Sequence, residues 1–261
     1  MDLKLIKKQD TKIVVLLKDT NSVFVNTLRR IMLSELPIMA VKRVTFIKNS
    51  SALFDEIIAL RLGLLPLNTN LDAYTLPEKC SCKGAGCAKC QVTFTLKAEG
   101  PLTVYASDIK SQDPQVKLVY GKMPIVQLLK DQELEFEAVA TLGTAQEHAK
   151  YTAGLAHYIG YPKITIDKVK NPDEVAESCP TRVYEVSGKQ LKVIDEQLCI
   201  LCNACVEIND PPEGLTVEAS EKDFIFSIES YGKLSPEEML RRALDVLDEK
   251  VVNFETALEK V

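Results

Sequence analysis

The order of apolar and polar residues predicts a chain that mixes strands and helices. At residues 133–142, Leu134, Phe136 and Ala138 alternate with glutamates, as is typical of a half-buried strand. Apolar runs bounded by turn-forming residues predict further strands at 3–17, 40–47, 92–106, 163–169 and 224–228. The fold class expected from these elements is α+β.

Three helices are expected, each with a recognisable start or end. Asn21 or Ser22 can cap a helix that Pro37 ends, and its apolar residues cover more than one face, so it should pack on more than its own sheet. Residues 53–67 predict a second helix. The third begins at a capping box, residues 235–238. It continues with apolar residues spaced alternately by four and three, a pattern that forms a heptad seam along one face of the helix. This seam faces either the core of this chain or a helix of a partner. Its residues are Leu240, Leu244, Leu247, Val251, Phe254 and Leu258.

Length and charge narrow the function classes. The 261 residues suggest two or three domains, and 32 Lys and Arg against 37 Asp and Glu give a net charge of −5. Because a nucleic-acid binder usually carries a basic excess, no direct specific DNA contact is expected. The chain shows neither an apolar stretch of the roughly 18 residues that span a bilayer nor a secretory signal, so no membrane association and a cytoplasmic location are expected.

Four of the eight cysteines predict an iron–sulfur site. Cys199, Cys202 and Cys205 have the C-x2-C-x2-C spacing that wraps a cluster, while Asn209 stands where a ferredoxin run has its fourth cysteine. Cys179, which a proline follows, has the sequence context of such a fourth ligand. The expected cofactor is one [4Fe–4S] (or [3Fe–4S]) cluster, and the alternatives are zinc in the same ligands or a disulfide.

The other four cysteines, Cys80, Cys82, Cys87 and Cys90, form C-x-C-x4-C-x2-C. Four thiolates satisfy tetrahedral zinc and leave no open position, so a Zn²⁺ bound here would be structural. Disulfides or a site without metal are the alternatives.

Catalytic chemistry has no visible basis in the sequence. The chain contains no phosphate-binding, dinucleotide-binding, nucleophile-elbow or H-E-x-x-H motif, so no catalytic residue and no small-molecule substrate are expected. An iron–sulfur electron-transfer subunit of an oxidoreductase is the competing hypothesis, although a flavin or nicotinamide motif is lacking.

Two segments resemble one family. Residues 26–37 (NTLRRIMLSELP) resemble the assembly helix of the bacterial RNA polymerase alpha subunit and its counterpart in the third-largest subunit of eukaryotic RNA polymerase II. Residues 54–67 (FDEIIALRLGLLPL) are similar to the second hallmark of that family. The cysteine cluster at 80–90 resembles a cluster found in the archaeal and eukaryotic members of the family. The ferredoxin-like insert at about 170–215 resembles an insert found in the archaeal members.

The resemblance implies a domain plan. A discontinuous alpha-subunit-like dimerisation domain would comprise residues 1–40 and 221–261. An inserted mixed α/β domain with the zinc-type cluster would span 41–165, and a small ferredoxin-like iron–sulfur module would span 166–220.

The resemblance also implies a non-catalytic assembly subunit of an archaeal DNA-dependent RNA polymerase. It would pair with the small subunit L, and the heterodimer would be the platform for the large catalytic subunits. Arg29 and Arg30 could pair with carboxylates of a large subunit. The expected partner interface consists of Phe24, Leu28, Arg29, Arg30, Ile31, Met32, Leu240, Leu244, Leu247, Val251, Phe254 and Leu258.

Overall fold

A computed structural model describes residues 1–260 of the chain. It confirms a mixed α and β fold in which the paired strands are antiparallel. The chain divides into two compact units, each described here by itself. The first unit comprises Met1–Gln9, Ile13–Arg29 and His157–Ser227, and the second comprises Asp10–Lys12, Arg30–Ala156 and Ile228–Val261.

A four-stranded sheet joins distant parts of the sequence in the order β1-β2-β12-β9. Its edge hairpin pairs Leu3 with Leu17, and all the apolar residues of the inner hairpin strand except the half-buried Val14 are buried. The strands expected over residues 3–17 are therefore confirmed as a hairpin, while the expected strands at 163–169 and 224–228 overlap much longer ones. The four strands are β1 (Asp2–Lys8), β2 (Lys12–Lys18), β12 (Leu215–Ser230) and β9 (Gly154–Ile166).

Helix α1 (Ser22–Ser34) confirms the expected helix near residues 22–36. The side-chain oxygen of Asn21 accepts a hydrogen bond from the backbone N–H of Phe24 at 2.9 Å, so Asn21 caps the helix. The helix ends three residues before Pro37, as a proline that cannot continue a helix requires.

The second unit has its core between a sheet and helix α2 (Asp55–Leu64). The sheet order is β3-β8-β4-β6, and Ile58 and Leu62 of α2 are buried in the same core as Phe94 and Phe136. The four strands are β3 (Ile38–Asn49), β8 (Glu133–Gly143), β4 (Gln91–Glu99) and β6 (Lys110–Ser111).

The single strand expected at 92–106 is two strands in different sheets. Strand β4 ends before Gly100 and Pro101, because proline has no N–H to donate to a β-ladder. The chain continues as β5 (Leu102–Tyr105), which pairs with β7 (Pro124–Leu128) in a separate two-stranded sheet.

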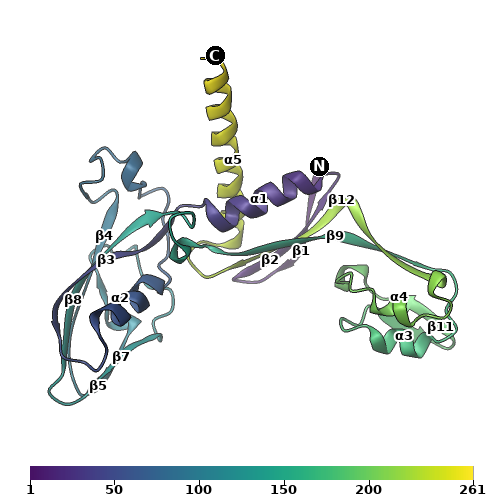
Figure 1. Ribbon diagram of the computed structural model, residues 1–261, viewed down its shortest axis with the longest axis horizontal. Helices are drawn as coiled ribbons and strands as arrows, with labels where there is room; N and C mark the ends of the chain where they lie inside the picture. Colours follow the sequence, from purple (N-terminus) through teal and green to yellow (C-terminus); the bar gives the residue numbers. More distant parts are fainter. Residues whose placement is uncertain (261) are drawn as a thin grey trace. The chain divides into compact units, whose positions relative to one another are not determined.

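A small module at residues 167–214 lies between the end of β9 and the start of β12 (Figure 1). Its base is closed by a hydrogen bond from the N–H of Asp167 to the carbonyl of Gly214 at 2.8 Å. It contains α3 (Pro172–Ser178), the hairpin β10 (Tyr184–Ser187) and β11 (Gln190–Val193), and α4 (Ala204–Ile208). Short 3-10 helices occur at Pro77–Lys79, Ala106–Asp108, Ala149–Tyr151, Glu196–Leu198 and Pro212–Gly214.

Helix α5 (Pro236–Leu258) confirms the expected C-terminal helix, and the Ser235 hydroxyl caps it by accepting from the N–H of Glu238 at 3.1 Å. Its buried residues are Pro236, Met239 and Ala243. Among residues 1–260, no helix is both long and apolar enough to cross a membrane. Ion pairs between Glu249 and Lys79, Arg242 and Asp72, and Lys250 and Glu35 anchor the helix within the second unit.

Candidate metal centres

The first cysteine set lies on a loop of tight turns between α2 and β4. The N–H groups of Lys83, Ala85 and Cys90 each donate to a carbonyl three residues earlier. Gly84 and Gly86 have positive φ of 81° and 94°, a conformation that glycine adopts without steric cost. These turns fold the loop back so that all four thiols meet.

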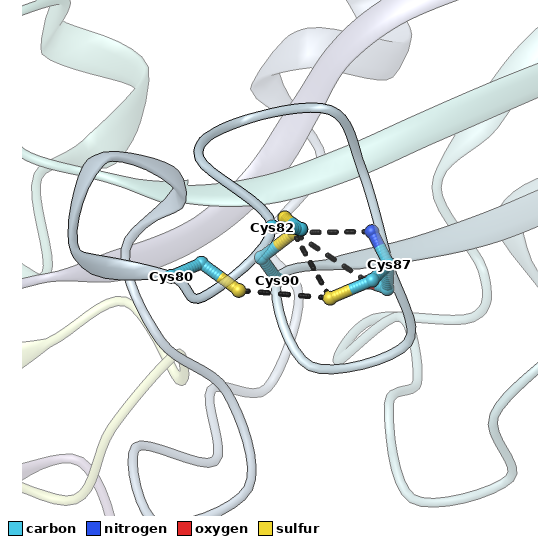
Figure 2. Close-up of side chains that lie close together, drawn as sticks. All are labelled: Cys80, Cys82, Cys87 and Cys90. Carbon is cyan, nitrogen blue, oxygen red and sulfur yellow. Dashed lines mark hydrogen bonds between the residues drawn. The ribbon is translucent and has the colours of Figure 1, made fainter.

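The four sulfur atoms form a compact group (Figure 2). The Sγ atoms of Cys80 and Cys87 are 3.6 Å apart, those of Cys82 and Cys90 are 3.5 Å apart, and those of Cys87 and Cys90 are 3.8 Å apart. All four lie within 4.8 Å of one another. A zinc ion with bonds of about 2.3 Å to four tetrahedral sulfurs separates them by about 3.8 Å, so the thiols already stand at zinc-binding distances. The measured separations are far longer than the roughly 2.05 Å of a disulfide.

Electrostatics distinguish the thiols of this group. A hydrogen bond from the Cys80 thiol, followed by one from the Gly86 backbone, lowers the pKa of Cys82 to about 6. Burial raises the pKa of Cys90 to about 12. A cation would favour the thiolate form of all four cysteines, because metal binding requires deprotonated sulfur.

Three cysteines of the second set share the core of the 167–214 module. Cys199 and Cys205 are buried there with Val175 and Tyr184, and Cys179 packs against the same core at the end of α3. Cys202 is exposed. Burial raises the pKa of Cys199, and the charges of Cys205, Cys179 and Cys202 raise it further.

Three of these thiols accept directed hydrogen bonds. The N–H of Leu201 points at Cys199 Sγ (3.4 Å), and the N–H of Val183 points at Cys179 Sγ (3.4 Å). The Tyr184 hydroxyl lies 3.2 Å from Cys205 Sγ in a buried position. The Cys199–Cys205 loop places Leu201 and Asn203 in the left-handed region, with φ of 59° and 61°. Non-glycine residues are held there only when the surroundings demand it.

Asn209 occupies the position of the absent ferredoxin cysteine and has a structural role. Its side chain is buried and its Nδ2 donates to the carbonyls of Lys168 at 3.2 Å and Pro211 at 2.6 Å. It therefore ties the loop after α4 to the base of the module.

The heptad seam of α5 is open in the structure. Leu240 and Leu247 are half-buried, whereas the exposed fractions of Leu244, Val251, Phe254 and Leu258 are 39%, 49%, 66% and 57%. The residues that α5 buries, Pro236, Met239 and Ala243, form a stripe directly beside the seam on the helix surface. Of the two possibilities left open by the sequence, the structure favours a seam that this chain does not cover.

The predicted interface residues of α1 are less exposed than those of the α5 seam. Leu28, Ile31 and Met32 are buried within the chain, with exposed fractions of 2%, 2% and 0%. In this chain they are therefore core residues. The sequence could not show this, because periodicity indicates which faces of a helix are apolar but not what covers those faces. Phe24 is half-buried, Arg30 is exposed, and Arg29 donates to the Asn26 side chain at 3.0 Å.

Two buried polar residues were missed at the sequence level. Tyr184 contacts Cys205 across 21 positions, and Lys233 is 6% exposed with its Nζ donating to the Lys150 carbonyl. Neither residue belongs to a motif, so the sequence held no signal for these non-local contacts.

Comparison with known protein families identifies the central part of the chain. The family model of the RNA polymerase Rpb3/RpoA insert domain matches residues 44–169. This range contains most of the sheet β3-β8-β4-β6, helix α2 and the cysteine group at 80–90.

Full-length relatives define the family more closely. A Methanosphaera stadtmanae protein called DNA-directed RNA polymerase subunit Rpo3 is 40% identical over 97% of this chain and 98% of its own length. Proteins of the same name from Methanothermobacter thermautotrophicus and Archaeoglobus fulgidus are 38% and 35% identical, over 99% and 100% of this chain and 99% and 98% of their own. The chain belongs to the Rpo3 family of DNA-directed RNA polymerase subunits.

Proposed function

We propose that this chain is a non-catalytic assembly subunit of an archaeal DNA-dependent RNA polymerase. It would pair with the small subunit L, and the pair would form the platform on which the large catalytic subunits assemble. The observation that carries this proposal is the open apolar seam of α5, because four large apolar side chains along this seam stay accessible in the free chain.

Helix α5 is built to present that seam. Its polar residues Arg242, Glu249 and Lys250 form ion pairs within the chain, and Met239 and Ala243 are buried. The helix is therefore held along one side while its seam faces outward. Seams of this heptad type pack against a second helix by inserting knobs into holes.

A charge placed in the seam tests the pairing. Leu244→Asp and Leu247→Asp should each weaken binding of subunit L at least about a hundredfold, because a carboxylate would be desolvated without a partner. Val252→Asp is the matched control, since Val252 is 57% exposed on the same helix but lies off the seam. Affinity is measured by co-purification and titration of the two subunits. Wild-type affinity in both seam variants would refute the interface.

The cysteine group at 80–90 is proposed to hold a structural Zn²⁺. Its four sulfurs stand 3.5–3.8 Å apart where the contacts are closest, which matches a tetrahedral ion. All four positions around such an ion would be filled by protein, so it would cross-link the loop and offer no site for a substrate or water.

The module at 167–214 is proposed to be ferredoxin-like and to hold one [4Fe–4S] (or [3Fe–4S]) cluster through Cys179, Cys199, Cys202 and Cys205. The donor set supports the fit, because the thiols of Cys179, Cys199 and Cys205 share one core, Cys202 lies on the exposed loop between two of them, and two backbone N–H groups point at the sulfurs of Cys179 and Cys199. When bound, such a cluster would cross-link α3 to the 199–205 loop.

A further inference from the structure

We infer that Tyr184 is a positioning residue for the proposed iron–sulfur site, and that its hydroxyl sets the reduction potential of the cluster by donating a hydrogen bond to Cys205 Sγ. This inference rests on the proposed cluster and adds a function for a residue outside the cysteine motif.

The geometry is that of a fixed donor. Tyr184 begins β10, is 6% exposed, and its hydroxyl lies 3.2 Å from Cys205 Sγ. A phenol at neutral pH carries its proton, whereas a ligating cysteine is a thiolate, so the hydroxyl donates and the sulfur accepts. The pairing of Tyr184 with Val193 across the β10–β11 hairpin fixes the backbone that carries the ring.

Tyr184 differs from the other donors around the thiols. The bonds to Cys179 and Cys199 come from the backbone of Val183 and Leu201, which almost any residue could supply. Thr181 has its hydroxyl 3.7 Å from Cys179 Sγ, beyond a strong contact. Among the residues that the structure describes, Tyr184 is thus the one side chain with an O–H within 3.5 Å of a thiol of this set.

The expected effect follows from charge. A hydrogen bond to a ligating thiolate withdraws electron density from the sulfur and stabilises the more negative, reduced cluster, so it raises the potential. The low dielectric of the buried site strengthens that effect. A tyrosine needed only for packing would have no such influence, because phenylalanine fills almost the same volume.

The test uses the full chain purified anaerobically, with iron content and visible absorbance measured first. The potential is then determined by dithionite titration with redox mediators, followed by electron paramagnetic resonance. Tyr184→Phe should keep its iron and shift the potential to more negative values. Tyr158→Phe is the matched control, since Tyr158 packs on Phe224 and Phe226 away from the cysteines, and its potential should equal that of the wild type.

A second substitution keeps the inference testable if Tyr184→Phe loses the cluster. A 3-fluorotyrosine placed at position 184 keeps the ring and makes the hydroxyl a stronger donor, so the potential should move to more positive values. Equal potentials in the wild type and the altered chains would overturn the inference. Absence of iron from wild-type chain would instead overturn the proposed cofactor, so the two failures are distinguishable.

Discussion

The buried side chain of Lys233 allows a quantitative test of how its charge affects the stability of the second unit. Between β12 and α5 its side chain is almost completely buried, and its Nζ donates to the Lys150 carbonyl at 2.5 Å. Within residues 1–260, no carboxylate forms an ion pair with it. Burial lowers the pKa of Lys233 to about 8.

The size of this effect on the unfolding free energy follows from the linkage between proton binding and folding. The pKa of an unfolded lysine is about 10.4 and one pKa unit equals about 1.4 kcal/mol, so keeping this ammonium charged in the folded chain costs at most about 3 kcal/mol at pH 7. Because the folded pKa is the lower one, the unfolded chain binds more protons, and this cost disappears as pH rises from about 8 to about 10.5. Lys233→Met removes the charge at similar length but loses one hydrogen bond, worth about 1 kcal/mol. The net gain in unfolding free energy at pH 7 should be about 2 kcal/mol.

The assay is urea unfolding followed by far-UV circular dichroism, since the chain has no tryptophan to report by fluorescence. The advantage of Lys233→Met should shrink to below about 1 kcal/mol at pH 9.5. Lys130→Met, at an exposed lysine, should change little at either pH. A Lys233→Met variant less stable than wild type at pH 7, or an advantage independent of pH, would refute the reasoning.

Two further predictions concern the metal centres. Elemental analysis should find about one zinc per chain, lost in Cys87→Ser or Cys90→Ser but kept in Cys202→Ser; a full zinc complement in the first two variants would exclude the site. Anaerobically prepared Cys202→Ser should lose visible absorbance, become protease-sensitive at about 175–210 and lower the yield of assembled polymerase, with near-normal specific activity in what assembles. An enzyme that assembles normally with this variant but cannot elongate RNA would point to a direct redox or regulatory role.

Local signals explain which elements were predictable. Helices α1 and α5 carry their own caps at Asn21 and Ser235, and both helices begin where the sequence predicts. The first part of β9, by contrast, contains Gly154, Gly160 and His157, a weak strand signal, and only its pairing with β12 makes it a strand. Such pairing depends on residues far apart in the sequence.

The residues of the candidate sites also fall into those that local sequence signals predict and those that they do not. The spacing of Cys80, Cys82, Cys87 and Cys90 predicts a group of thiols, and the structure brings these four together. Tyr184 and Lys233 were not predictable, because the contacts that define them join distant segments.

The hydrogen bond between Asp167 and Gly214 closes the base of the 167–214 module, directly where β9 ends and β12 begins. In topological terms the module is an elaborated hairpin tip, since the two strands are neighbours in the sheet. This hydrogen bond brings the two strand ends together below the tip, so their pairing needs no tight turn inside it. Residues inside the tip can therefore be exchanged or removed without a break in the sheet below, so the module is an accessory on which the sheet does not depend.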